Sequence, residues 1–140
     1  MVTYSTNLNL KNTDLGILIL RLAAGGLMLT HGLPKLSKLF AGGELAFADP
    51  LGVGVELSLT LAVFAEVICA VLIIIGLGTR LAAVPLIITM LVVFFIVHGA
   101  DPLRAKELSL LYLMAYIVLA ITGSGKYSLD YYFLKQKDKK

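Results

Sequence analysis

Apolar residues are gathered into four long runs instead of the short alternating stretches typical of half-buried strands. A helix needs roughly 20 apolar residues to cross the ~30 Å hydrocarbon layer of a membrane, and each run reaches or approaches this length. Residues that are typical of helix starts precede the first run, as Asn12-Thr13-Asp14, and open the fourth, as Asp101-Pro102. The pattern predicts four membrane-spanning helices, at about residues 15–31, 55–76, 81–98 and 102–122.

The breaks between the runs indicate how the helices are connected. Only residues 77–80 separate the second run from the third, and only Gly99-Ala100 separate the third from the fourth. Joints this short place consecutive helices antiparallel and side by side, which predicts an all-α, integral membrane up-down four-helix bundle. Residues 32–54 form a longer link with Pro34, Pro50 and five glycines, and they predict a partly ordered loop at the membrane surface.

The two halves of the chain carry similar punctuation. His31-Gly32 and His98-Gly99 end the odd-numbered runs, while Ala48-Asp49-Pro50-Leu51 and Ala100-Asp101-Pro102-Leu103 precede the even-numbered ones. One interpretation is a duplication that yields two related helical hairpins about an axis along the membrane normal. The other is helix-end chemistry that the two halves share by coincidence. Under either interpretation, both histidines are expected on the same side of the membrane.

Composition agrees with an integral membrane protein built as one unit. Of the 140 residues, 59% are hydrophobic and 15% charged, against about half and about a quarter in soluble domains. The single cysteine, Cys69, excludes an internal disulfide. The net charge of +3 reflects lysines crowded at the C-terminus, and it predicts the lipid bilayer, and no nucleic acid, as a partner.

Lysine and arginine residues outside the runs predict the orientation. Seven are expected on the side of both termini (Lys11, Arg80, Lys126, Lys135, Lys137, Lys139 and Lys140) and four on the other (Lys35, Lys38, Arg104 and Lys106). Both termini are therefore expected in the cytoplasm, with residues 1–14 as an N-terminal segment, 15–125 as the membrane domain and 126–140 as a basic tail. Arg21 interrupts the first run, which favours a retained helix over a cleaved signal peptide.

Two charged residues fall well inside the runs: Arg21 in the first, and Glu66 halfway along the second. A charge within the bilayer is costly and normally faces a partner inside the bundle, and antiparallel helices place these two at overlapping depths. The sequence thus predicts an Arg21–Glu66 pair, with Gly25 and Met28 on the face of Arg21 and Cys69 on the face of Glu66. The pair either polarises a ligand or only fixes the helix register.

The outer ends of the helices collect further titratable groups. His31 and His98 lie there with acidic residues nearby, and histidine can relay protons; the alternative is that both simply reach water. No H-x-x-x-H, H-E-x-x-H or C-x-x-C spacing occurs, so no metal site is predicted. Tyr112 and Tyr116, one helical turn apart, either hydrogen-bond a carbonyl ligand or pack the bundle.

Three stretches together resemble the DoxX family of small four-helix membrane proteins. They are residues 21–36, residues 64–83, and Gly123-Ser124-Gly125-Lys126-Tyr127-Ser128-Leu129-Asp130, in which Ser124 and Lys126 replace the commoner Pro and Arg. The resemblance implies quinone-linked oxidoreduction in the bacterial inner membrane, with a bound quinone and no covalent cofactor. The residues expected to act are then the catalytic candidates Arg21, Glu66, His31 and His98, and the quinone-pocket candidates Gly25, Met28, Cys69, Tyr112 and Tyr116.

The sequence carries no nucleotide, flavin or cluster motif, so an oxidoreductase of this kind needs a cofactor-bearing redox protein as partner. We expect a quinone-interacting or membrane-anchoring subunit, and a homo-oligomer is compatible with the pattern. The alternative is a non-enzymatic scaffold, assembly factor or small-molecule carrier. A ring-sized cavity beside Arg21 favours the first expectation, and a tightly filled core favours the second.

Overall fold

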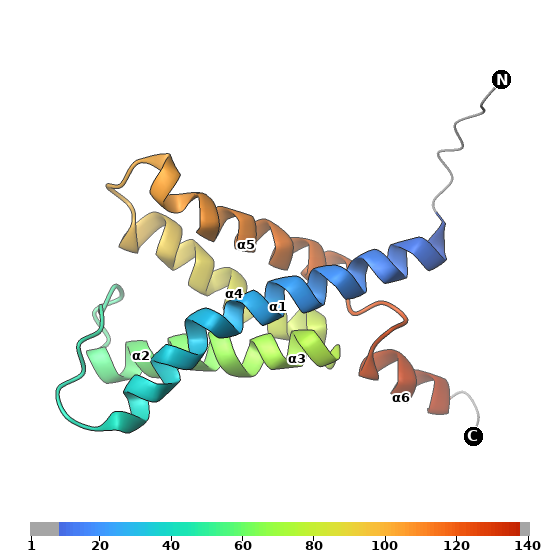
Figure 1. Cartoon of the computed structure of the whole chain (residues 1–140), viewed down its shortest axis with the longest axis horizontal. Coiled ribbons are helices and arrows are strands. Elements are labelled where there is room, and N and C mark those ends of the chain that lie inside the picture. Colours follow the sequence, from blue (N-terminus) through green and yellow to red (C-terminus); the bar gives the residue numbers. More distant parts are fainter. Residues whose placement is uncertain (1–8, 138–140) are drawn as a thin grey trace.

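The computed structural model describes residues 9–137. These residues form helices joined by connections, and they contain no strand. Three segments follow one another without a break: α2 (Val55–Val63), the π-helical segment η1 (Phe64–Cys69) and α3 (Ala70–Ile75). The remaining elements are α1 (Leu10–Ala41), α4 (Thr79–Val92), the π-helical η2 (Val93–Val97), α5 (Leu103–Thr122) and α6 (Leu129–Lys137) (Figure 1). The first eight residues and the tail lysines Lys139 and Lys140 lie outside the described part of the chain.

Four of these helices are long and apolar enough to cross a membrane: Leu10–Ala41, Val55–Ile75, Thr79–Val97 and Leu103–Thr122. The prediction of an all-helical membrane bundle is confirmed. Helix α1 packs along α2, η1 and α3, while α4 packs along α5, and contacts of α1 with α5 and of α4 with η1 join the two pairs. Large apolar side chains on every span remain exposed, among them Ile19, Phe64, Ile88 and Leu111, as suits surfaces that face lipid.

The bundle has two ends that differ in chemistry. The start of α1, the turn at residues 76–78 and helix α6 lie at one end, here called the terminal end (Figure 1). The connection at residues 42–54 and the turn at residues 98–102 lie at the other, here called the loop end. Charged groups inside the bundle are divided between these two ends.

Helix α1 is longer than the sequence pattern predicts. It continues through Pro34 to Ala41, where a loop was expected from residue 32. Leu36 and Leu39 in this extension pack against a cluster of Leu59, Val63 and Val67. The partial burial of these leucines compensates for the backbone hydrogen bond that a proline removes from a helix interior. Tertiary packing therefore overrides the tendency of proline to end a helix.

Asp49 organises the connection that remains, residues 42–54. Its carboxylate accepts hydrogen bonds from the Ser58 hydroxyl (2.7 Å) and from the backbone N–H groups of Gly54 (2.8 Å) and Val53 (3.0 Å). These donors, the Ser58 hydroxyl first, hold the pKa of Asp49 below its ordinary value of 3.8. The carboxylate thereby fastens the connection to the start of α2.

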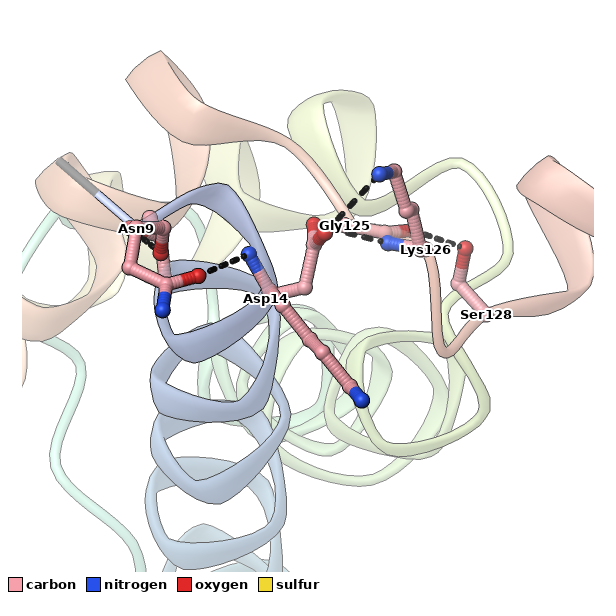
Figure 2. A network of polar contacts seen from close by, with 7 residues as sticks. Asn9, Asp14, Gly125, Lys126 and Ser128 are labelled. Carbon is pink, nitrogen blue, oxygen red and sulfur yellow. Dashed lines mark hydrogen bonds and ion pairs between the residues drawn. The ribbon is translucent and has the colours of Figure 1, made fainter.

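At the terminal end, α1 is tied to the segment that follows α5 (Figure 2). The Asp14 carboxylate accepts a hydrogen bond from the backbone N–H of Lys126 at 3.1 Å and lies 3.7 Å from the Lys126 ammonium. The Ser128 hydroxyl donates to the carbonyl of Gly125 at 2.6 Å and closes this turn. The stretch Gly123 to Asp130 is therefore a fixed part of the bundle.

Candidate functional site

Arg21 is buried at the terminal end and satisfied entirely by backbone carbonyls. Its guanidinium donates to Ile73 O (2.8 Å), Ile74 O (2.7 Å), and to both Ser124 O and Tyr127 O at 2.8 Å. The first two are carbonyls at the C-terminus of α3, where a cation is favoured. Arg21 forms no ion pair within residues 9–137, so the prediction that Glu66 is its partner is wrong.

Close packing leaves no space for a ring beside Arg21. A Cβ placed on Gly76 would lie 2.5 Å from a terminal guanidinium nitrogen of Arg21, and one placed on Gly25 would lie 2.6 Å from the Ile74 side chain. Gly25 thus serves the approach of α1 to α3. Cys69 is buried in the core with Ile73, and neither Gly25 nor Cys69 lines a cavity described below.

Glu66 pairs with Lys35 at the loop end. The Lys35 ammonium lies 2.5 Å and 2.7 Å from the two carboxylate oxygens of Glu66, which is 2% exposed, against 28% for the lysine side chain. This pairing exists because α1 continues past Pro34 and carries Lys35 alongside η1. The backbone of Gly32 passes so close to η1 that an added Cβ would lie 2.7 Å from the Glu66 carbonyl oxygen.

Both charged partners line a cavity of about 190 Å³ at the loop end. It is lined by residues of α1, η1, α4, η2 and α5 and by His98, and its polar members are His31, Lys35, Glu66, His98, Ser109 and Tyr112. Met28, Met90 and Val93 supply apolar wall. We call this space the head chamber. The structure thus brings His31, His98, Glu66, Met28 and Tyr112 to one chamber and leaves Arg21 outside it.

The two histidines reach the chamber in different ways. The His31 ring lies edge-on to Tyr112, with centroids 6.0 Å apart. The Nδ1 atom of His98 lies 2.7 Å from a carboxylate oxygen of Asp101, and both side chains are partly open to solvent. A carboxylate fixes the ring orientation of the imidazole it contacts and leaves Nε2 free to exchange a proton.

The paired tyrosines are not equivalent. Tyr116 is fully buried, and its hydroxyl donates to the Ala24 carbonyl at 3.1 Å, so it joins α5 to α1. Tyr112 stacks on Tyr116 and lines the chamber. Within residues 9–137 its hydroxyl makes no hydrogen bond, which leaves it available to a ligand.

Lys35 and Ser109 are chamber residues whose roles the sequence did not single out. Lys35 is one helical turn after His31 and Ser109 is one turn before Tyr112, so helical spacing from those candidates points to both. The sequence placed Lys35 among the charged groups at the outer ends, but its pairing with Glu66 was not predicted, because the first helix was expected to end at His31. No group of three or more His, Cys, Asp or Glu side chains within the described residues is placed to hold a metal ion.

Comparison with known proteins places the chain among its relatives. The sequence model of the DoxX family matches residues 16–99. The chain belongs to the DoxX family. The matched part contains Arg21 and two of its four carbonyl partners, those of Ile73 and Ile74. It also contains most of the polar groups of the chamber: His31, Lys35, Glu66 and His98.

Two curated relatives extend the similarity over nearly the whole chain. The protein named "Putative oxidoreductase CatD" from Bacillus subtilis (strain 168) is 30% identical over 128 residues, covering 91% of this chain and 93% of its own. An uncharacterized protein from Haemophilus influenzae is 30% identical over 127 residues, covering 84% of this chain and 90% of its own. No solved structure matches this DoxX protein.

Proposed function

We propose that this DoxX-family membrane protein binds a quinone ring in the head chamber and is the quinone-interacting or membrane-anchoring subunit of an oxidoreductase. The observation that carries the proposal is the convergence of the Lys35–Glu66 pair, two histidines and Tyr112 on one cavity inside a membrane bundle. The name of the Bacillus subtilis relative, a putative oxidoreductase, supports the reaction class.

The chamber residues suit the chemistry of a quinone. Reduction of a quinone adds two electrons and two protons and converts both carbonyl groups to hydroxyls. The Lys35 ammonium and the Tyr112 hydroxyl are donors that can hold a carbonyl oxygen, and Glu66 keeps the ammonium in place. His31 and His98, at the mouth, exchange the protons with water. A cofactor-bearing partner protein supplies the electrons.

Arg21 has a different part in this proposal. Its four carbonyl contacts lie outside the chamber, so we assign it to holding α1, α3 and the segment after α5 together. The filled surroundings of Arg21 are the observation that favours the second candidate function, a non-enzymatic scaffold, assembly factor or carrier. Under that candidate, the polar interior only fixes the bundle.

Purification in mild detergent separates the two candidates. Mass spectrometry of the purified protein is expected to detect co-purified quinone and a redox protein partner, and Lys35→Met should lose the quinone. A Lys38→Met variant is the matched control, because Lys38 is on the same helix and outside the chamber. Quinone retained equally by both variants would exclude Lys35 from the binding site, and the absence of quinone from the purified wild-type protein would support the scaffold instead.

The histidines provide a kinetic test of the same proposal. His31→Ala and His98→Ala are each expected to slow quinone-linked turnover about tenfold or more and to change its pH profile, since proton transfer by a positioned side chain typically contributes ~10²-fold or more. Thr30→Ala, on the exposed surface of α1, should leave both unchanged. Full activity and an unaltered pH profile in both histidine variants would contradict the proposal that these histidines exchange protons with water.

A further inference from the structure

A second, larger cavity adjoins the head chamber and faces the outside of the bundle. It has a volume of about 530 Å³ and lies between α2 and η1 on one side and α4 and η2 on the other. The connection at residues 42–54 covers its loop end, with Phe47 and Leu51. Leu61, Phe64, Ile88 and Val97 form much of its wall. We call it the side groove.

The groove exists because two helices diverge. Helix α4 packs against η1 and α3, whereas α2 and α4 are not a closely packed pair. Figure 1 shows α2 and the end of the α4–η2 helix spreading apart toward the loop end. Leu61, Phe64 and Ile88 are about half exposed, at 48%, 48% and 54%. In a membrane this opening is therefore directed at lipid.

The wall of the side groove is mostly apolar and therefore suits a hydrocarbon chain. Apart from the residues that it shares with the chamber, its polar side chains are those of Ser58 and Thr89. The Ser58 hydroxyl already donates to Asp49, and the Thr89 hydroxyl donates to the Pro85 carbonyl at 2.8 Å. No polar group of the wall is left in need of a partner, so an apolar chain fits without cost to hydrogen bonding.

The groove and the head chamber meet at one place. Lys35, Glu66, Val93 and His98 line both spaces. Glu66 offsets the charge of the Lys35 ammonium at this junction, so the junction suits an uncharged carbonyl oxygen better than a phosphate anion. A molecule with a small uncharged polar ring and a long apolar chain therefore matches both spaces together.

We propose that the side groove holds the isoprenoid tail of the quinone whose ring occupies the head chamber, and that the quinone enters between α2 and α4 from the bilayer. The inference rests on the proposed function and adds the substrate class, long-tailed lipid quinones in preference to tail-less ones. Because the tail enters from lipid that is as apolar as the groove wall, the discrimination comes from van der Waals packing of the tail along the groove and not from transfer out of water.

A bulky side chain in the groove tests the proposal. Ala62 lines the groove and is on α2, away from the head chamber, so Ala62→Phe should occupy tail space only. Ala23→Phe, on the exposed surface of α1, is the matched control. Ile88→Trp is a second groove variant at an exposed position that disturbs no core packing. The probes are a long-tailed quinone, the same ring without its tail, and an isoprenoid alcohol without the ring.

Binding to the full chain in mild detergent is measured by native mass spectrometry. Both groove variants are expected to weaken binding of the long-tailed quinone and of the alcohol about tenfold, because the added side chain takes the space of the tail. Binding of the tail-less ring to these variants, and binding of all three probes to the Ala23→Phe control, should stay unchanged. Unaltered binding of the long-tailed quinone would overturn the groove while leaving the proposed function intact. If the groove variants weaken binding of the alcohol but neither quinone binds, the groove is an isoprenoid site and the assignment of a quinone to it is overturned. Loss of co-purified phospholipid alone would assign the groove to an ordinary bilayer lipid and overturn the proposal.

Discussion

Arg21 and Glu66 are both almost fully buried, at 1% and 2% exposure, and each is satisfied by a different kind of partner. The guanidinium reaches four carbonyls from two separate segments, the end of α3 and the segment after α5, which uses its planar fork of donors. Among residues 9–137, the carboxylate pairs with one cation, the Lys35 ammonium. Changes at one residue should therefore not be felt at the other.

Double-mutant cycles should show this separation. Glu66→Met alone leaves the Lys35 ammonium without its counter-charge, whereas adding Lys35→Met removes that penalty, so we expect a coupling energy of about 1–3 kcal/mol. Arg21→Met should destabilise by about 3 kcal/mol or more, because several buried carbonyls lose a charged donor. Combined with Glu66→Met it should be additive within about 0.5 kcal/mol. Stability is measured by unfolding in detergent, and coupling between Arg21 and Glu66 would contradict the structure.

The elements around the head chamber are joined by close backbone contact. Gly32 allows α1 to approach η1, and this approach brings Lys35 within reach of Glu66. The π-helical segment η1 contains Glu66, and the π-helical segment η2 ends directly before His98. Such turns are frequent at functional sites because they re-aim side chains, and here both border the chamber.

Gly32→Ala is expected to destabilise the bundle by about 1–3 kcal/mol, as overpacking typically does, and to weaken quinone binding. The added methyl would meet the Glu66 carbonyl carbon at 2.8 Å as well as its oxygen, and backbone cannot rotate away as a side chain can. Gly26→Ala is the control on the same helix, since nothing lies within 4 Å of its added Cβ. That substitution should be neutral or stabilising by up to ~1 kcal/mol. Equal melting temperatures for the two variants would count against the close approach.

The connection at residues 42–54 depends on an ionised carboxylate. Because the folded-state pKa of Asp49 is lowered below its ordinary value of 3.8, the contribution of this carboxylate to stability is present above that value and is lost as pH falls through the lower folded-state pKa. We expect acid proteolysis of this connection to accelerate below pH ~4. In Asp49→Asn the anchor should already be weak at neutral pH, with little further change on acidification. A wild-type connection equally resistant at both pH values would refute this role.

Across the whole molecule, one end of the bundle is a structural clamp and the other holds a chamber and a groove. The terminal end carries Arg21 and the fixed segment after α5, and the loop end carries the Lys35–Glu66 pair and both histidines. We propose, from the distribution of lysine and arginine, that the terminal end faces the cytoplasm of a bacterial cell. Together with the proposed function, this orientation would have the chamber exchange protons on the side of the membrane opposite the cytoplasm.

Cysteine labelling checks this orientation. Lys106→Cys, near the loop end, should react with an impermeant thiol reagent on intact cells, whereas Lys137→Cys should react only after permeabilisation. The native Cys69 is 2% exposed and should stay unlabelled in both. Labelling of Lys137→Cys alone would invert the topology and place the chamber mouth in the cytoplasm.

Several features of this DoxX protein follow from the sequence alone. Hydropathy and run length determine four spans, because bilayer thickness sets the number of apolar residues that a helix must have. Short joints determine that consecutive spans are antiparallel. Together these place His31 and His98 at the same end, where the structure has them line one chamber. Each of these properties depends on a local pattern and on the order of elements along the chain.

The partners of the buried charges were decided only by tertiary structure. Arg21 bonds to a carbonyl 52 residues away and Lys35 to a carboxylate 31 residues away, and depth in the membrane alone does not distinguish such choices. They depend on the axial rotation of each helix, on the approach allowed at Gly32, and on the packing that carries α1 through Pro34. A hydropathy average contains no information on helix rotation or on the distance between helices, whereas a change of about an ångström makes or breaks a hydrogen bond. The shared wall of the head chamber and side groove likewise follows from how α2 and α4 diverge in three dimensions.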